Sequence, residues 1–577
     1  MPDHPVETTA DRYTACDALL NALRESGVTH IFGNLGSDHA GIVQSMSRAK
    51  LEGRPMPRMI LSPHEGMALA AAHGYAQVTG QAQAVFVHVD VGTQNMGGAI
   101  SNALHGRVPV FIFAGLTPFT LEGELPGSRN RAATYLQDVP DQGGIVRQYV
   151  KWDYSIRTGK NVTQLVQRAM QIAHSDPKGP VYLTGAREVL EEDVSPQTLP
   201  AAQWRPVEAG ALTEDHVAKI ARALLEAQKP LLVTSYSGRN SACVGQLRRL
   251  CERLALRVVE ERPIHMNFPA DHPLHQGYQA GALIADADVI VILDCDVPWI
   301  PSSKQRPRPD ARIFYIDVDP LKETIPLWYM PSERFLRADS AVALGQLNDC
   351  LDGMPPMEEA RRLARLDDAR DAHEKMRAEW KRKGLPEADG GVTPEMVAAC
   401  LNSLLDSDAI IVNEAVTNAG AVFQHLPRTR PGTFFGSGGS SLGWAGGAAL
   451  GIKLAAPERD VVCFTGDGSF FFINPSSVYW CARRYQAPFL TIVFNNQGWN
   501  ATQQNFKRIH GAHSPMEIGD CVSLAPTADF AGIAQAAGGT LALTVETADE
   551  LPGMLAQALR ATRAGQCAVV EVRLPGI

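Results

Sequence analysis

Short apolar runs alternate with segments of helical period along nearly the whole chain. Nine of these runs have the length and continuous apolar character of strands that are buried on both faces. They are Ala84–His88, Val108–Ala114, Pro230–Thr234, Val289–Leu293, Arg312–Ile316, Ile410–Val412, Val461–Thr465, Leu490–Phe494 and Ala568–Val572. Because such strands are typical of parallel sheets covered by helices, the pattern predicts an α/β fold with doubly wound parallel sheets.

Two polar breaks interrupt this alternation. Residues 191–207 are polar and contain prolines, which indicates a linker after a first domain. The second break contains the charge-dense stretch Met357–Lys383, where Leu363, Leu366 and Met376 are spaced for one apolar stripe, as in a solvated connecting helix. The breaks predict three α/β domains over residues 1–190, 205–350 and 390–577, with a linker helix over 351–389.

The composition is that of a multidomain globular protein. The chain has 577 residues, 45% hydrophobic and 20% charged, and roughly 100–200 residues make a domain. Its 53 Lys and Arg against 62 Asp and Glu give a net charge of -9, so no basic surface for nucleic acid is expected. Residues 1–5 do not resemble a signal peptide and no apolar stretch reaches about 18 residues, so we expect a cytoplasmic protein without membrane segments.

Polar clusters follow two of the predicted strands in the third domain. Gly466–Ser469 comes directly after one, and Asn495–Gly498 after the next. The carboxyl ends of parallel strands form the ligand-binding edge of an open sheet. A carboxylate, an amide oxygen and a carbonyl suit Mg²⁺, and glycines let a phosphate approach the backbone. The pattern predicts a magnesium-diphosphate site, although Gly-Asp-Gly alone is equally typical of a plain strand-to-helix turn.

Taken together, the two clusters resemble the thiamine-diphosphate motif, which begins with Gly-Asp-Gly and closes with Asn-Asn about thirty residues later. The resemblance implies thiamine diphosphate and Mg²⁺ as cofactors. The implied metal ligands are Asp467, Asn496 (with Asn495 as the alternative) and the main-chain oxygen of Gly498, and the implied diphosphate-binding residues are Gly466, Gly468 and Ser469.

A second segment, Ser62–Ala76, carries Glu65 just after a strand and at the start of a helix of small residues. Alone, an acidic residue there is commonly only a complement to the helix dipole. The segment also resembles the one with which thiamine-diphosphate enzymes activate their cofactor, where a carboxylic acid shares a proton with the pyrimidine ring nitrogen. Apolar neighbours should let Glu65 exchange a proton near neutral pH. Gly92 and Asn95, a little further on, are implied to bind the cofactor.

A third segment, Gly436–Ala448, is a Gly/Ser loop that enters a helix of small residues, and helix packing alone could explain its glycines. In the family, a bulky apolar residue here holds the cofactor bent, and Leu442 matches that position. The carbonyl of Ser440 would accept a hydrogen bond from the cofactor amine. Asn413 and Val416 would lie beside the diphosphate.

Overall the chain resembles the superfamily of acetolactate synthase, benzoylformate decarboxylase and oxalyl-CoA decarboxylase. This implies a pyrimidine-binding, a central and a diphosphate-binding domain. It also implies a homodimer or homotetramer with active sites at the subunit interface, where Glu65 of one chain acts with Asp467 of another.

Some positions depart from the family pattern. His88 and Asp90 replace a glycine-rich loop and are either additional ionisable catalytic groups or turn residues bonded to backbone amides. Gln137 stands where synthase-type members have an active-site glutamine, which favours carboligation. In the central domain, the segment Tyr236–Arg239 lacks the repeated glycines that cradle a pyrophosphate, which argues against FAD.

We therefore expect decarboxylation of a 2-oxo acid with carboligation to a second carbonyl compound. The alternatives are a simple 2-oxo acid decarboxylase, a lyase of 2-hydroxyacyl-CoA or oxalyl-CoA, and a non-catalytic paralogue. A dinucleotide-dependent dehydrogenase is disfavoured because no Gly-x-Gly-x-x-Gly follows a strand. Residues after the metal motif are expected to line or cover the substrate pocket or to form a surface loop, and they are Trp499, Asn500, Gln503, Gln504, Phe506 and His510.

Overall fold

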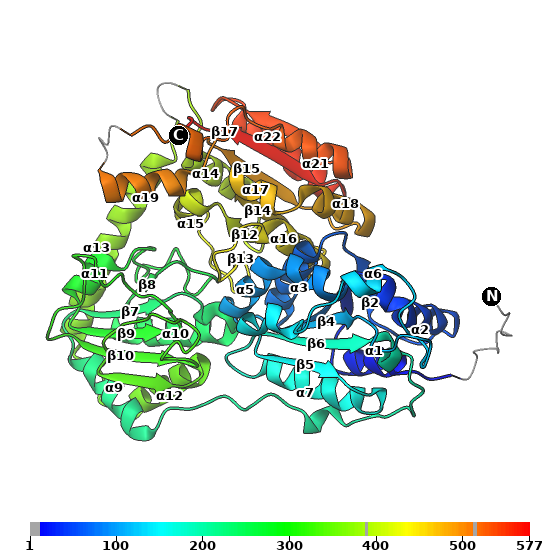
Figure 1. Ribbon diagram of the computed structural model, residues 1–577. Coiled ribbons are helices and arrows are strands. Elements are labelled where there is room, and N and C mark those ends of the chain that lie inside the picture. Colours follow the sequence, from blue (N-terminus) through cyan, green and yellow to red (C-terminus); the bar gives the residue numbers. More distant parts are fainter. Residues whose placement is uncertain (1–11, 387–389, 512–515) are drawn as a thin grey trace. The chain divides into compact units, whose positions relative to one another are not determined.

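A computed structural model describes residues 12–386, 390–511 and 516–577 (Figure 1). The five N-terminal residues used to argue against a signal peptide lie outside these ranges. Within them the strands form three sheets, and all neighbouring strands in these sheets are parallel. Helices cover the sheets, so the predicted α/β fold class is confirmed.

The first sheet has six strands in the order β2-β1-β3-β4-β6-β5. They are β1 (His30–Asn34), β2 (Arg58–Leu61), β3 (Gln83–Val87), β4 (Val110–Leu116), β5 (Trp152–Ile156) and β6 (Pro180–Ala186). The accompanying helices are α1 (Ala15–Glu25), α2 (Ala40–Leu51), α3 (Glu65–Thr79), α4 (Val89–Asn95), α5 (Gly97–His105), α6 (Ala133–Leu136), α7 (Val162–His174) and α8 (Arg187–Leu190). The turn η2 (Ser37–His39) follows β1.

The central sheet has five strands in the order β11-β10-β9-β7-β8. They are β7 (Pro230–Thr234), β8 (Arg257–Glu260), β9 (Val289–Leu293), β10 (Arg312–Asp317) and β11 (Arg334–Arg337). The helices are α9 (Glu214–Glu226), α10 (Ser241–Leu254), α11 (Gly281–Asp286), α12 (Ser340–Asp352) and α13 (Glu359–Lys383).

The third sheet has six strands in the order β13-β12-β14-β15-β17-β16. They are β12 (Ile410–Glu414), β13 (Phe434–Phe435), β14 (Val461–Gly466), β15 (Leu490–Asn495), β16 (Leu541–Val545) and β17 (Ala568–Arg573). The helices are α14 (Pro394–Leu404), α15 (Ala419–His425), α16 (Trp444–Ala455), α17 (Asp467–Phe472), α18 (Pro475–Tyr485), α19 (Asn500–His510), α20 (Gly519–Val522), α21 (Phe530–Gly538) and α22 (Leu551–Arg563).

The described chain divides into two compact units. One comprises residues 1–207 with 438–456 and 480–485, and the other comprises 208–437, 457–479 and 486–577. The first unit therefore includes α16, which packs closely on α3. Each of the three sheets falls inside one predicted domain, but the predicted boundaries 1–190, 205–350 and 390–577 remain a prediction, as does the extent of the 351–389 linker, of which residues 387–389 are not described.

Glycine lets the α3–α16 pair approach this closely. A Cβ at Gly451 would lie 1.9 Å from the carbonyl oxygen of Ala71, and one at Gly74 would lie 2.4 Å from the carbonyl oxygen of Ala448. The two helices therefore touch backbone to backbone, which only residues without a side chain permit at these points. Since α3 begins at Glu65, this contact also fixes the start of the helix that carries the predicted acid.

The charge-dense segment forms a helix, and its predicted apolar stripe is confirmed only in part, because Leu366 packs against the hydrophobic core. In α13 the buried side chains are Arg365, Ala369, His373 and Trp380, whereas Leu363 is 44% exposed. The Arg365 guanidinium donates to the carbonyls of Leu254 (3.0 Å) and Leu224 (3.1 Å), in the last turns of α10 and α9. One buried cation thus satisfies the free carbonyls at the ends of two helices.

Within the described ranges, none of the helices combines the length and the apolar character required to cross a membrane. All ten cysteines lie in these ranges and none forms a disulfide.

Candidate functional site

The predicted acid Glu65 is the first residue of α3. The His64 side chain caps the helix by accepting a hydrogen bond from the Gly66 N–H at 3.1 Å. Glu65 is 5% exposed, and its two carboxylate oxygens accept hydrogen bonds from Asn34 Nδ2 (2.8 Å) and Asn95 Nδ2 (3.0 Å). The expected apolar surroundings are therefore wrong, because an amide faces each oxygen. Two fixed donors orient the carboxyl group.

The first turn of α4 lies directly against this carboxylate. A Cβ at Gly92 would be 3.3 Å from Glu65 Oε1 and 3.1 Å from Val87 Cβ, so a side chain there would crowd the acid. The helix starts at Val89, whose φ of 29° is rare for a β-branched residue. Gly92 and Asn95, both expected to bind the cofactor, thus lie around Glu65.

His88 and Gln137, both predicted as catalytic, lie together. The imidazole Nδ1 is 2.6 Å from Asp38 Oδ1, and Nε2 is 3.2 Å from Gln137 Oε1. The hydrogen bond that His88 donates to Asp38 outweighs partial burial and raises the pKa of His88. Burial would raise the pKa of the Asp38 carboxyl, but hydrogen bonds with His39 and His88 hold it well below its usual range. Sequence reasoning missed Asp38.

Asp90, the remaining predicted catalytic residue, is 5% exposed in the first turn of α4. Its Oδ2 accepts a hydrogen bond from Gln94 Nε2 at 3.3 Å, one helical turn on. Its charge contributes to the raised pKa of His88. The side chain is therefore close enough to act on the imidazole electrostatically.

The predicted metal ligands lie together at the carboxyl ends of β14 and β15. Asp467 is 3% exposed and accepts the N–H groups of Gly468 (2.7 Å) and Gly498 (2.9 Å). The terminal amide atom of Asn496 that faces this carboxylate is 3.1 and 3.3 Å from its two oxygens and 3.2 Å from the Gly498 carbonyl oxygen. With nitrogen inward the amide donates to all three, and with oxygen inward it completes a cluster of oxygens.

These separations fit a magnesium ion. Mg²⁺ takes oxygen ligands at about 2.1 Å in an octahedron, so neighbouring ligand oxygens lie about 3 Å apart. Burial raises the pKa of the Asp467 carboxyl, and a bound cation would favour the charged carboxylate instead. Among the residues described, no group of three or more His, Cys, Asp or Glu side chains could hold a metal by themselves. An amide and a carbonyl would have to complete the site.

Asn495, the alternative ligand, has other partners. Its Nδ2 donates to Thr527 Oγ1 (2.7 Å) and Glu571 Oε1 (2.8 Å), and its Oδ1 accepts the Gln497 N–H (3.1 Å). With both ends of the amide occupied, Asn495 anchors β15 to its neighbour. Asn496 is the one of the two whose amide faces Asp467.

The residues expected around the diphosphate lie on the same sheet edge as Asp467. Gly466 ends β14, Ser469 is 3% exposed in α17, and Asn413 lies in β12 with its Oδ1 accepting the Ala415 N–H at 3.1 Å. Val416, at the start of η8 (Val416–Asn418), has a φ of 49° and is 49% exposed. A β-branched residue in this conformation is strained, and such strain gathers at ligand sites.

The indole ring of Trp499 covers the loop after β14. A Cβ at Gly468 would lie 2.4 Å from the ring of Trp499, so the indole sits directly on the backbone beside Asp467. The other residues expected to line or cover the pocket are Asn500, Gln503, Gln504, Phe506 and His510, all on α19. None of the α19 side chains is buried, and their role stays a prediction.

The loop with Ser440 and Leu442 belongs to the first compact unit. Asn102 brackets the residue between them, since its Nδ2 donates to the Ser441 carbonyl (2.8 Å) and its Oδ1 accepts the Ser441 N–H (3.1 Å). A Cβ at Gly438 would lie 2.2 Å from Gly106 Cα, so this loop is seated against α5 and the turn after it. Sequence reasoning missed Asn102, whose partner is 339 positions away.

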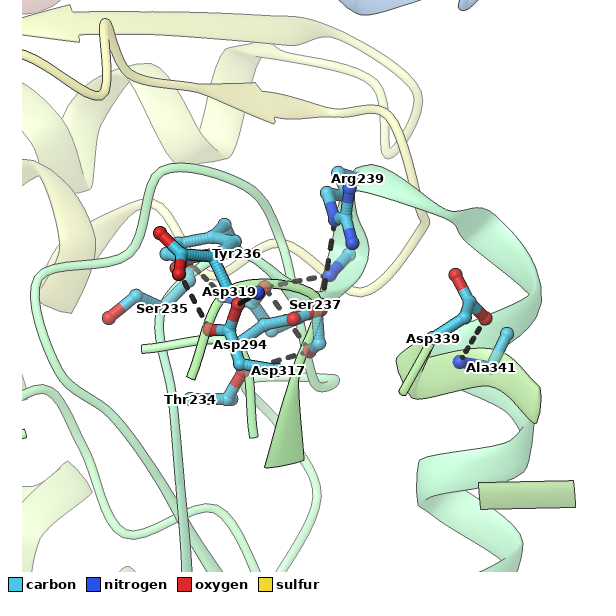
Figure 2. Close-up of polar contacts among 12 residues, drawn as sticks. Thr234, Ser235, Tyr236, Ser237, Arg239, Asp294, Asp317, Asp319, Asp339 and Ala341 are labelled. Atoms are coloured by element: carbon cyan, nitrogen blue, oxygen red, sulfur yellow. Dashed lines mark hydrogen bonds and ion pairs between the residues drawn. The ribbon is translucent and has the colours of Figure 1, made fainter. Parts of the chain in front are cut away.

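A polar cluster fills the carboxyl edge of the central sheet, where the sequence argued against FAD (Figure 2). Asp317 ends β10 and accepts the Asp319 N–H (2.8 Å) and Lys322 Nζ (2.6 Å). Lys322 also contacts Asp296 (2.8 Å) and the Tyr236 hydroxyl (3.1 Å). These groups bond to one another, and the absence of FAD stays a prediction.

Comparisons with known proteins agree with this architecture. Family models described as the N-terminal TPP binding domain, the central domain and the C-terminal TPP binding domain of thiamine pyrophosphate enzymes match residues 13–145, 217–328 and 415–572. Thiamine pyrophosphate, or TPP, is another name for thiamine diphosphate.

Relatives cover nearly the whole chain. Benzoylformate decarboxylase of Pseudomonas aeruginosa is 26% identical over 573 residues, which are 95% of this chain and 97% of the relative. The acetolactate synthase isozyme 3 large subunit of Escherichia coli is 25% identical over 587 residues, 98% and 95% of the two chains. The solved structure of a 4-hydroxybenzoylformate decarboxylase from Rhodococcus jostii RHA1 has a TM-score of 0.78 at 23% identity, covering 98% of this chain and 100% of that one. The chain therefore belongs to the thiamine-pyrophosphate-dependent enzymes.

Proposed function

We propose that this enzyme holds thiamine diphosphate through Mg²⁺ and decarboxylates a 2-oxo acid. The observation that carries the proposal is the gathering of the Asp467 carboxylate, the Asn496 amide and the Gly498 carbonyl at one sheet edge, with separations of 3.1–3.3 Å. This donor set is the kind that a hard divalent cation prefers.

The chain's own groups take the following roles in this proposal. Asp467, Asn496 and Gly498 hold the metal, while the backbone of Gly466 and Gly468 and the Ser469 hydroxyl bind the diphosphate. Leu442 and the Ser440 carbonyl contact the cofactor, and Asn413 and Val416 lie beside its diphosphate. When bound, the cofactor supplies a nucleophilic carbon that adds to the carbonyl of the substrate and accepts the electron pair released with CO₂.

Glu65 takes part in proton transfer to and from the cofactor. Its carboxyl exchanges a proton with the pyrimidine ring nitrogen, and Asn34 and Asn95 keep both oxygens aligned for that exchange. Gly92 supports this by leaving room for the carboxyl group.

After CO₂ has left, the rest of the substrate can react in two ways at this site. Transfer to a second carbonyl compound, the carboligation expected from the sequence, is supported by Gln137. Protonation, which releases an aldehyde, is supported by His88, whose Nε2 faces Gln137 Oε1 at 3.2 Å. Because that contact engages the Gln137 oxygen with the imidazole, the geometry favours protonation, with carboligation as the second candidate. The names of the relatives include both a decarboxylase and a synthase.

A binding titration tests the cofactor assignment. Tryptophan fluorescence of the full chain should change saturably with thiamine diphosphate and Mg²⁺ together, and EDTA should reverse the change. Asp467→Ala should lose this metal-dependent response. Asp460→Ala is the matched control, because Asp460 precedes the same strand and pairs with Arg563 at the opposite edge. Binding that ignores Mg²⁺ and EDTA would contradict the proposal.

Product analysis separates the two fates. The holoenzyme is incubated with aromatic and aliphatic 2-oxo acids, with and without an added aldehyde, and the products are resolved by chromatography. An aldehyde as the main product supports protonation, and a 2-hydroxyketone supports carboligation. Release of CO₂ from no 2-oxo acid would refute both. Assembly into a homodimer or homotetramer remains a prediction that light scattering can check.

A further inference from the structure

A buried carboxylate lies under the imidazole of His88. Asp38, in the turn after β1, is 5% exposed, and its Oδ1 is 2.6 Å from His88 Nδ1. Its Oδ2 accepts the Val89 N–H at 3.3 Å. Asp38 thus contacts both the imidazole and the backbone of the residue after it, across 50 positions of sequence.

The fold leaves space for this pair at two glycines. A Cβ at Gly36 would lie 2.1 Å from His88 Nδ1, and one at Gly115, in β4, would lie 1.7 Å from Asp38 Oδ2. The bare backbone of two segments therefore lies against the imidazole and against the carboxylate. Neither group can move toward its glycine, so the pair is held in one arrangement.

The hydrogen-bond partners define where the imidazole keeps its protons. Since a carboxylate only accepts, Nδ1 of His88 carries a proton toward Asp38. Nε2 faces the acceptor Gln137 Oε1 at 3.2 Å, so a protonated Nε2 is satisfied there as well. The His88 side chain is 21% exposed, so it is not sealed from solvent. The proton that exchanges is therefore the one at Nε2.

Other ionisable groups near His88 come from each neighbouring element. His39, on η2, is fully buried with its Nδ1 2.9 Å from the same Asp38 oxygen. Asp90, on α4, adds a negative charge. Asp138, next to Gln137, is paired with Arg129. Among these partners the Asp38 carboxylate is the one bonded directly to the ring.

We propose that Asp38 is a positioning residue, which holds His88 with its exchangeable proton at Nε2 for the protonation step of the proposed function, in which this proton is delivered to the substrate carbon that has lost CO₂. In that step the N–H bond of Nε2 breaks and a C–H bond forms with the electron pair left by CO₂. His88 becomes neutral and keeps the proton on Nδ1, which it donates to Asp38. It regains the proton on Nε2 from water. This delivery step rests on the proposed decarboxylase function.

The pH dependence follows from the charge of Asp38. A carboxylate bonded to an imidazolium raises its pKa by about 1–3 units, so Asp38→Asn should lower the pKa of His88 by a similar amount. Activity that needs the imidazolium is lost as pH rises through this pKa. The basic limb of kcat should therefore move to lower pH in Asp38→Asn, and kcat at pH 8 should fall by about tenfold or more with a much smaller change in KM.

Chemical labelling measures the ionisation of His88 without any cofactor. The full chain is treated with diethyl pyrocarbonate, which modifies neutral imidazole, across a pH series, and the His88 peptide is quantified by mass spectrometry. In the unmodified sequence the midpoint should lie above about 6.5, the ordinary value for histidine. It should fall by about one unit or more in Asp38→Asn. Asp141→Asn, which removes an exposed carboxylate of the same unit paired with Arg147, should leave it unchanged.

Each outcome decides a separate point. A midpoint at the ordinary value in the unmodified chain, or one that Asp38→Asn does not move, overturns the positioning role. The first of these needs no variant, so a folding defect in Asp38→Asn does not protect the proposal. Turnover whose pH profile is the same in Asp38→Asn overturns the delivery step. A shifted midpoint without turnover of any 2-oxo acid keeps the positioning role and refutes the decarboxylase and the delivery step.

Discussion

Alanine at Gly451 should loosen the contact between α3 and α16. The new Cβ would lie 1.9 Å from the Ala71 carbonyl oxygen and 2.7 Å from its carbonyl carbon, whereas real Cβ contacts essentially never fall below 3.0 Å. The obstacle is backbone, so the helices themselves must part by roughly 1 Å to reach van der Waals distance.

The magnitude follows from two opposing effects. Overpacking of a close-packed contact costs about 1–3 kcal/mol. Replacing glycine by alanine inside a helix stabilises the helix by about 0.5–1 kcal/mol. We expect a net loss of about 1–2 kcal/mol in the stability of α16. Gly345→Ala in α12 is the matched control, because a Cβ there meets nothing within 4 Å. That variant should gain about 0.5–1 kcal/mol.

Hydrogen–deuterium exchange resolves the effect where it arises. Because the chain has several domains, a single unfolding midpoint is not a defined quantity, whereas exchange reports local opening. Peptides from residues 444–455 should exchange about five- to thirtyfold faster in Gly451→Ala, which is the rate equivalent of 1–2 kcal/mol. Equal protection of α16 in Gly451→Ala and Gly345→Ala would refute the reasoning.

Three further outcomes follow from the site and the core. Glu65→Gln should leave cofactor affinity within a few fold but slow proton exchange at the reactive cofactor carbon by about 100-fold or more, as measured by NMR, and near-normal exchange would defeat its assignment. Arg365→Met should leave two helix ends without their donor and speed hydrogen exchange in the last turns of α9 and α10 by the rate equivalent of about 2–3 kcal/mol, whereas Arg370→Met, on the exposed face of α13, should change little. Burial lowers the pKa of His265 to about 3, so the unfolded chain binds a proton that the folded chain does not. Local stability around His265 should therefore fall as pH drops from about 6.5 toward 3, and His265→Phe should make that fall shallower, as measured by hydrogen exchange of the peptides around this residue between pH 6 and 4 after correction for the intrinsic exchange rate; an unchanged slope would argue against it.

The strands that the sequence predicted are mostly buried on both faces, but β6 and β8 are equally buried and were not predicted. All nine continuous apolar runs are strands, from β3 to β17, because burial on both faces leaves no polar position to interrupt them. Strands such as β5, with Asp153 and Ser155 at the edge of the sheet, lack that pattern. On α13 the predicted apolar stripe was incomplete, because Arg365 and His373 are also buried, with their polar ends on backbone carbonyls, which a count of apolar residues does not register.

Some residues of the candidate site were likewise predicted from the sequence and others were not. Motifs contiguous in sequence predicted Asp467, Asn496 and Glu65 as functional positions, and the Asn95–Glu65 contact and the Asp467–Asn496 approach bring predicted positions together, whereas Asn34 was not predicted. Asp38 was not predicted, since its meaning depends on His88, which reaches it only through the pairing of β1 with β3. A residue whose role is set by a partner on another strand leaves no local signal.

The two valines at positive φ bear on how this enzyme could be made more robust. Val89 and Val416 each hold a conformation that costs on the order of 1–3 kcal/mol for a β-branched residue. Screens for thermostable variants should therefore recover glycine or asparagine at both positions, because these residues adopt that conformation with less strain. Those variants would relax the backbone beside His88 and after β12, so heat resistance gained there should come with slower turnover.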